Sequence, residues 1–186
     1  MSTLFFHESE FEGNACRISV ANYLAFLSLR GPELAIEVAK IRQALAAPSR
    51  KHLERDISLL LRARNWRFHN IACVAIACTE ASSQLLEELW SCIKRGSWTS
   101  PQLAATAEMV DKDFGRRAVH LIEDQATYFK SIVALAALLE ARHSTESQLS
   151  AAARSNLDEA KTIDRDNSGS IATAWNGNLR AAFGAA

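Results

Sequence analysis

Three side chains that could bind a metal ion fall within one turn of a predicted helix. His120, Glu123 and Asp124 are three and four residues apart, a spacing that places them on one face. A metal site would need further ligands from another helix, and the five histidines supply no second HxxE pair. We therefore expect a solvated polar face here and predict no metal ligands.

The four cysteines, Cys16, Cys73, Cys78 and Cys92, match neither a zinc ribbon nor a CxxC redox pair. Cys73 and Cys78 are five residues apart, which rotates their side chains away from a common helical face. We expect buried free thiols.

The sequence also contains no Gly-rich phosphate loop, GxSxG elbow or HExxH pair. We therefore predict neither catalytic residues nor a cofactor. The sequence favours a protein without enzymatic activity over an enzyme.

Oxygen-bearing side chains recur at positions one, three and five of the sequence DRDNSGSI, residues 164–171, with Gly169 at position six. This pattern resembles the first eight positions of an EF-hand calcium loop. The resemblance fails at position twelve, where Trp175 replaces the bidentate Glu. We expect residues 164–170 to form a structural turn before a short C-terminal helix, and leave open whether residues 164–175 bind any ion.

Basic residues gather around one predicted helix and the turn that follows it. They are Arg50, Lys51, Arg55, Arg62, Arg64 and Arg67, beside Trp66 and His69. The arginine stems could simply cover apolar surface, and Glu54 and Asp56 interrupt the cluster. If the cluster binds a partner, the predicted contact residues are Arg62, Arg64, Arg67 and His69.

The elements that would position these residues are helical, because apolar residues recur at three- and four-residue steps and only seven glycines and three prolines interrupt them. Caps and breakers predict helices over residues 14–29, 34–45, 50–64, 71–78, 83–95, 101–110, 114–123, 126–142, 144–163 and 171–182. At 186 residues, we expect one all-α domain spanning residues 1–186.

Two stretches of the chain match each other at a spacing of 32 residues. Leu53–Cys78 superposes on Leu85–Val110 and brings Trp66 onto Trp98. A weaker third copy, shifted by a further 30 residues, places Tyr128 under Trp98. Such a period is typical of helical solenoids, in which stacked helix pairs bury each other's faces. The register predicts that both tryptophans are largely buried.

The segment NWRFHNIA, residues 65–72, resembles the turn and second helix of HEAT-like repeats, over roughly residues 50–140. It departs from them at His69, where the family usually has Arg, and at Ser100-Pro101 in the second copy. The predicted fold is therefore stacked antiparallel helix pairs, either a HEAT-like α-solenoid or an irregular multi-helix bundle. The resemblance implies a scaffold that binds proteins or, less often, nucleic acid.

The charge of the whole chain is balanced, with 21 Lys and Arg against 21 Asp and Glu. No long-range field attracts nucleic acid, so we expect another protein as partner. A nucleic-acid role for the basic cluster and a small bacterial inhibitor or immunity-type protein remain as alternatives. The acidic N-terminus does not resemble a secretory signal, and no apolar run approaches a membrane span, so we expect a cytoplasmic location and no membrane contact.

Overall fold

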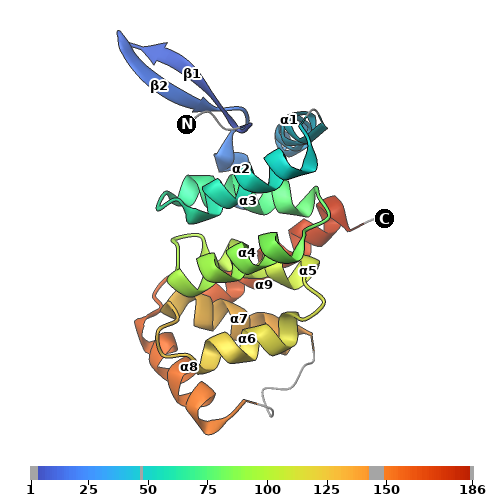
Figure 1. Ribbon diagram of the computed structural model, residues 1–186. Coiled ribbons are helices and arrows are strands. Elements are labelled where there is room, and N and C mark those ends of the chain that lie inside the picture. The colour runs from blue at the N-terminus through green and yellow to red at the C-terminus, as the bar shows by residue number, and fades with distance from the viewer. Residues whose placement is uncertain (1–3, 47, 143–148, 185–186) are drawn as a thin grey trace.

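The computed structural model describes residues 4–46, 48–142 and 149–184. Helices make up most of this part, which confirms the all-α prediction (Figure 1). The elements are β1 Phe6–Phe11, β2 Asn14–Ser19, a 3-10 helix η1 Tyr23–Phe26, α1 Leu34–Ala46, α2 Arg50–Arg62, α3 Trp66–Ala77, α4 Ser83–Arg95, α5 Ser100–Val110, α6 Phe114–Glu123, α7 Phe129–Ala141, α8 Ala151–Ile163 and α9 Ser168–Phe183. None of the helices in the described ranges has the length and apolar character that a membrane crossing requires.

The predicted helix over residues 14–29 is wrong. Residues 14–19 form β2, which pairs antiparallel with β1 in a hairpin that projects from the helical body (Figure 1). The reason lies in the preceding turn, because Glu12 and Gly13 adopt φ values of +50° and +77°, the left-handed geometry that joins two antiparallel strands tightly. Asn22 then caps the short helix η1 by accepting a hydrogen bond from the Leu24 N–H at 3.0 Å.

Three helical hairpins follow one another through the centre of the molecule: α2 with α3, α4 with α5, and α6 with α7. In successive hairpins α2 packs on α4, α3 packs on α5, and α5 packs on α7 (Figure 1). Helix α8 covers α6 and α7, while α9 lies against α5 and α7. This packing is compatible with a helical repeat, as the 32-residue match predicted.

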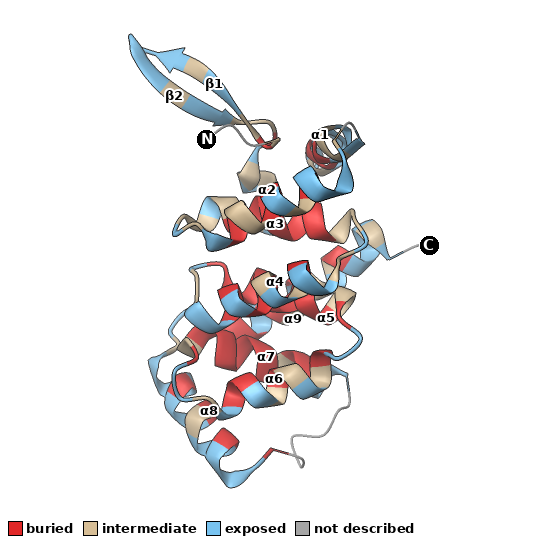
Figure 2. Cartoon of the chain, viewed as in Figure 1, coloured by how far each residue is buried: buried red, intermediate tan, exposed pale blue. Residues whose placement is uncertain are grey.

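Buried small side chains allow the inner helices to approach closely. Residues Ile71–Ile76 of α3 are fully buried, and Ala104, Ala105 and Ala107 of α5 are buried to the same extent (Figure 2). The outer helices α2, α4 and α6 bury only one face (Figure 2). The first six residues of the apolar segment IACVAIAC are therefore buried between neighbouring elements, as the lack of a polar face indicated, whereas Ala77 and Cys78 are only partly buried.

Helices α4, α5 and α6 begin within one residue of their predicted starts, whereas α3 begins at Trp66 and not at residue 71, and α9 begins at Ser168 and not at residue 171. Asn65, Ser82 and Ser150 each accept a backbone hydrogen bond from the first turn of α3, α4 and α8. One helix was expected over residues 126–142, but α7 begins only at Phe129 because Asp124 accepts a hydrogen bond from the Ala126 N–H at 2.9 Å and holds a turn. The predicted start at Ser144 lies outside the described residues.

Candidate interaction surface

The four predicted contact residues do not share one environment. Arg62 donates to Glu88 of α4 through both Nε, at 2.9 Å, and a terminal nitrogen. This pairing lowers the pKa of the Glu88 carboxyl. Arg64 is exposed, Arg67 lies over two aromatic rings, and His69 is buried. The cluster is therefore not a continuous basic ridge.

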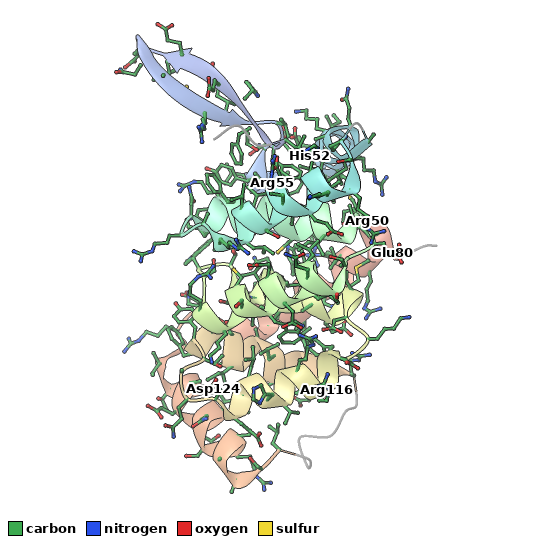
Figure 3. The ribbon with its side chains drawn as sticks, viewed as in Figure 1. Arg50, His52, Arg55, Glu80, Arg116 and Asp124 are labelled. Carbon is green, nitrogen blue, oxygen red and sulfur yellow. The ribbon has the colours of Figure 1, made fainter. Side chains whose placement is uncertain are left out.

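Two other arginines of the cluster are also matched by carboxylates. Arg50 pairs with Glu54 at 3.2 Å and with Glu80 at 3.6 Å, and Arg55 pairs with Asp56 at 2.9 Å. Figure 3 shows Arg50 and Glu80 side by side, next to α2. These pairs locally neutralise the positive charge that a phosphate backbone would need.

His69 holds the loop between α4 and α5 in place. Its Nε2 lies 2.8 Å from the Ala63 carbonyl oxygen, which can only accept, so Nε2 carries the proton. Its Nδ1 then accepts from the Ser97 hydroxyl at 2.7 Å. Burial lowers the pKa of the imidazole, which is therefore neutral near pH 7. Ser97 in turn accepts from the Thr99 N–H, which fixes the residues on both sides of Trp98.

Trp66 and Trp98 are neighbours, but the prediction that both are largely buried is wrong for Trp98. Their ring centroids lie 4.7 Å apart at an interplanar angle of 55°. Trp66 is half-buried and Trp98 is 55% exposed. Equivalent positions of stacked hairpins are adjacent in space, so each ring packs on the other instead of inserting into its own turn. One side of Trp98 is therefore left at the surface.

Tyr23 and Arg67 extend this aromatic pair. The Tyr23 ring meets Trp66 edge-on, with centroids 5.6 Å apart. The Arg67 guanidinium lies 4.7 Å from the Trp66 centroid, and its Nε donates to the Tyr23 hydroxyl at 2.9 Å. Asn65, the cap of α3, fixes the Arg67 backbone. The cation is thus held over the Tyr23 and Trp66 rings.

A hollow of about 350 Å³ opens beside Trp98. It lies between the chain after η1, the start of α5 and the middle of α9. Its apolar lining is supplied by Leu27, Trp98, Ile171, Ala174 and Trp175. Its polar lining includes Arg30 and Gln102. We call the hollow together with Tyr23, Trp66 and Arg67 the Trp98 surface.

Side-chain hydrogen bonds from α5 and α9 fix the wall of the hollow that follows η1. Trp175 donates its indole N–H to the Phe26 carbonyl at 2.9 Å. Gln102 donates to the Leu27 carbonyl at 3.2 Å, and Asn178 donates to the Ser28 carbonyl at 2.8 Å. Three consecutive carbonyls are therefore held by two helices. Because this wall is already fixed, it loses little conformational entropy when a partner binds to the hollow.

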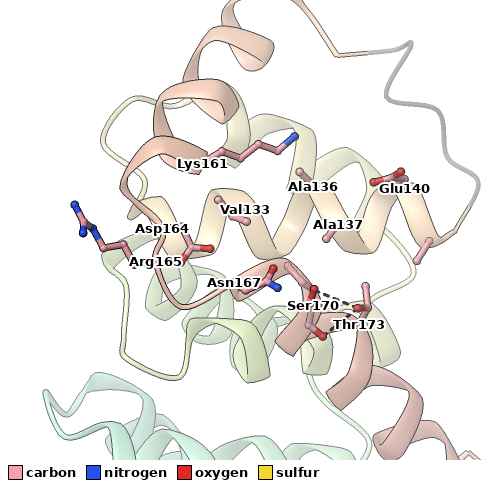
Figure 4. Close-up of a pocket in the computed structure, with 12 residues that line it drawn as sticks. Val133, Ala136, Ala137, Glu140, Lys161, Asp164, Arg165, Asn167, Ser170 and Thr173 are labelled. Carbon is pink, nitrogen blue, oxygen red and sulfur yellow. Dashed lines mark hydrogen bonds between the residues drawn. The ribbon is translucent and has the colours of Figure 1, made fainter.

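A second hollow, of about 680 Å³, lies where α7 meets the turn between α8 and α9 (Figure 4). Asp164, Lys161 and Glu140 line it (Figure 4). The Asp164 carboxylate accepts from both the backbone N–H and the hydroxyl of Ser168, at 2.7 and 2.9 Å, so it caps α9. Position twelve of the EF-hand-like segment, Trp175, is buried against Phe26. These contacts hold the turn before α9, but the turn is shorter than predicted, because Ser168–Ser170 already belong to α9, which is a helix of 16 residues.

Of the other candidate groups, His120 and Glu123 are exposed, whereas Asp124 and two cysteines are held by an ion pair or by packing. Asp124 pairs with Lys94 at 2.6 Å, which lowers the pKa of its carboxyl, instead of joining His120 in a cluster. No group of three potential metal ligands occurs in the residues that the structure describes. Cys73 and Cys92 are buried free thiols, as predicted, and burial raises the pKa of each to about 12. Cys16 and Cys78 are only partly buried.

Comparisons with known proteins found no matching family model, no matching curated protein and no matching solved structure.

Sequence reasoning found part of the Trp98 surface and missed the rest. The 32-residue match identified Trp66 and Trp98 as equivalent, and their equivalence is the signal that they could lie together. The contributions of Tyr23 and Trp175 carried no such signal. They come from segments more than 40 residues from α3 and α5 along the chain, which only the tertiary fold brings together.

Proposed function

We propose that the chain is a non-catalytic, HEAT-like helical-repeat module that binds another protein through the Trp98 surface. The exposure of Trp98 carries this proposal. A tryptophan is the residue type most enriched among side chains that dominate binding energy, and this one is held in place by Trp66 and by the loop that His69 fixes.

The surroundings of Trp98 have the composition of a protein interface. An apolar hollow lies beside Trp98, and Arg67, another favoured interface residue, lies over the Trp66 ring that packs on Trp98. Ile171, which lines the hollow, adds exposed apolar area, with 38% of the residue accessible. Grouped apolar side chains of this kind mark interaction sites more often than scattered ones do.

A partner that covers Trp98 would desolvate the aromatic pair and place its own polar groups near Arg67 and Arg30. The rings supply contact area at low entropic cost, and the guanidinium groups supply orientation. The partner we propose is a protein of the same cell. A small bacterial inhibitor that blocks such a protein is one form this function can take.

Capture of partners by the tagged chain from its native lysate, followed by mass spectrometry, tests the proposal. We expect at least one protein that the wild type retains and the Trp98→Ala variant loses. The matched control is Ile36→Ala, because Ile36 is 60% exposed on α1 and takes no part in the Trp98 surface. If Trp98→Ala captures the same proteins as the wild type, the proposal is wrong.

A further inference from the structure

The N-terminal hairpin is a sheet of two strands, and the described part of the chain supplies no third strand to it. β1 and β2 pair with each other and project from the helical body (Figure 1). The base of the hairpin is anchored to α3, where the Phe6 and Phe68 rings lie 4.6 Å apart. A hairpin of two strands is only marginally stable in water by itself, and a further strand stabilises such a sheet.

The strand register decides which backbone groups of β1 face away from β2. At the base of the hairpin the Val20 N–H donates to the Phe5 carbonyl at 3.0 Å, so these two residues form a hydrogen-bonded pair. Hydrogen-bonded and non-hydrogen-bonded pairs alternate along an antiparallel ladder. Glu8 and Glu10 therefore belong to non-hydrogen-bonded pairs, and their N–H and C=O groups point outward. β1 thus offers an unpaired strand edge at these two residues.

The side chains at this edge are acidic. Glu8 and Glu10 are exposed and share one face of the hairpin, because side chains alternate along a strand. The register places Glu10 opposite Ala15, so no cation faces it across the hairpin. Arg17 lies opposite Glu8, but the ion pairs of the described residues include neither of these two. The edge therefore combines outward backbone groups with carboxylates that could pair with a partner.

The opposite face of the hairpin carries exposed apolar side chains. Phe11, the last residue of β1, is 68% exposed, and Ile18 on the same face of β2 is 45% exposed. A third strand beside β1 would place alternate side chains on the two faces. One set would lie next to Glu8 and Glu10, and the other set would lie next to Phe11.

We propose that β1 receives an extended, basic segment of another protein as a third strand. Main-chain hydrogen bonds to Glu8 and Glu10 hold the segment in place. Lys or Arg side chains of the segment alternate with apolar ones, so that the cations face the two carboxylates and the apolar side chains pack beside Phe11. This surface is separate from the Trp98 surface and does not depend on it.

The charge of this edge opposes its pairing with β1 of a second copy. Two β1 strands paired with each other would bring the glutamates of one copy next to those of the other, and facing like charges destabilise a sheet. Charged side chains on an edge strand commonly prevent strands of identical chains from pairing. The same carboxylates favour a partner strand of opposite charge, and this complementarity is why we specify a basic segment.

Fluorescence anisotropy of the full chain with labelled synthetic peptides tests the proposal. The probe is a short peptide in which lysine and valine alternate, and the control peptide has the same composition with the lysines grouped at one end. Only the alternating peptide places all its lysines on one face when it is extended. We expect it to bind about tenfold more tightly than the grouped peptide, because it alone matches both faces of β1. Equal affinities, or no binding at about millimolar concentration, would overturn the proposal.

Proline substitutions establish which strand edge binds the peptide. Glu10→Gln removes only the charge, whereas Glu10→Pro also removes the outward N–H. Ala15→Pro is the matched control, because it removes the outward N–H directly across the hairpin, on the edge of β2. We expect the affinity for the alternating peptide to fall about two- to fivefold in Glu10→Gln and about tenfold or more in Glu10→Pro, and to be unchanged in Ala15→Pro. Close Hα–Hα contacts between Glu8 and Arg17 in NMR spectra check that the hairpin is intact in each variant.

Two further outcomes would overturn the proposal by identifying another arrangement. Loss of peptide binding in Ala15→Pro but not in Glu10→Pro would place the added strand on β2. Self-association of the wild type in sedimentation velocity, abolished by both proline substitutions, would show that β1 pairs with β2 of a second copy. Trp98→Ala should bind the alternating peptide as the wild type does, so the result is separable from that of the proposed function.

Discussion

His69 shows how one buried side chain controls the exposed Trp98. The imidazole joins the Ala63 carbonyl to the Ser97 hydroxyl, one residue before Trp98. The hydrogen bond in which Nδ1 accepts from the Ser97 hydroxyl requires the neutral ring, since a protonated ring has no acceptor, whereas Nε2 donates to the Ala63 carbonyl in either state. The position of Trp98 is therefore linked to the protonation state of an imidazole whose pKa is lowered by burial.

Because burial lowers the pKa of His69 below its ordinary value of 6.5, the unfolded chain binds the proton more tightly than the folded chain. We predict that the free energy of unfolding is independent of this group above about pH 6.5 and falls as the pH drops through the folded pKa, with a slope of at most about 1.4 kcal/mol per pH unit. Urea titrations between pH 7.5 and 5 measure the slope.

The control for this prediction is His69→Gln, which removes the titrating group and should flatten the slope in that window. Glu37, Glu88 and Asp124 also have lowered pKa values, but their ordinary values of 4.5 or below place their contributions under the window. Parallel pH profiles for the wild type and His69→Gln would contradict the assignment.

Gly96 is the second residue that the loop before Trp98 needs. It has φ of +87°, and a Cβ at this position would lie 2.2 Å from the Tyr128 ring. We predict that Gly96→Ala costs about 1–3 kcal/mol of stability from backbone strain, and more from the clash. Gly177→Ala is the matched control, because Gly177 is exposed within α9 with open space around it, and should add about 0.5–1 kcal/mol. Chemical denaturation measures both, and changes of the same sign would contradict the prediction.

At the level of single residues, sequence patterns predicted helix caps better than they predicted the site. Asn65 and Ser82 show why, because each cap acts only on the first turn of its own helix. The burial of His69 and the exposure of Trp98 depend on what packs above them from another hairpin. The residues next to His69 and Trp98 in the sequence do not reveal this difference.

Among the elements, α9 joins the two ends of the chain. It packs on α5 and α7 and reaches the segment after η1 through Trp175 and Asn178. These contacts span about 150 residues of sequence. The C-terminal helix is therefore part of the wall of the Trp98 surface and not an appendage.

We predict that Trp175→Ala destabilises the fold by about 3–5 kcal/mol, because the ring is 2% exposed and leaves a cavity. Trp175→Phe keeps most of the volume but leaves the Phe26 carbonyl without its indole donor, at a cost of about 1–3 kcal/mol. Thermal and urea denaturation give both values. The control on the same helix is Ile171→Ala, at a 38% exposed residue, for which we expect about 0.5 kcal/mol. If Trp175→Ala and Ile171→Ala lowered the free energy of unfolding equally, this role of α9 would be excluded.

The helical elements were predictable because their period, caps and breakers agree over most of residues 50–142. The hairpin over residues 6–19 was not, because Ala15, Ile18 and the apolar residues after them also fit a helical spacing. The turn at Glu12–Gly13 decided between the two structures. Local turn chemistry outweighed periodicity in a segment that has little core to pack on.

For the whole molecule, the equal numbers of acidic and basic residues give no net attraction for polyanions. Arg50, Arg55 and Arg62 add little, since each is paired with a carboxylate. Arg67 is positioned over Tyr23 and Trp66. The positive charges of the basic cluster therefore lie in separate local interactions and do not combine into one electrostatic field.

We therefore predict no binding of duplex or single-stranded oligonucleotides at physiological salt. Fluorescence anisotropy at low and physiological salt measures this, and any weak binding at low salt should disappear as salt rises, because phosphate contacts release counterions. Micromolar binding at physiological salt that is lost when Arg62, Arg64 and Arg67 are changed to Ala, without loss of helicity, would instead favour the nucleic-acid alternative.

The central claim is that Trp98 and its surroundings bind another protein. Isothermal titration of a captured partner with the wild-type chain and with Trp98→Ala tests it most directly, after circular dichroism and the Tm have established that the variant is folded. Loss of a dominant interface residue costs about 2 kcal/mol or more, so we expect the Kd to rise about 30-fold or more. A Kd for Trp98→Ala equal to that of the wild type would contradict the claim.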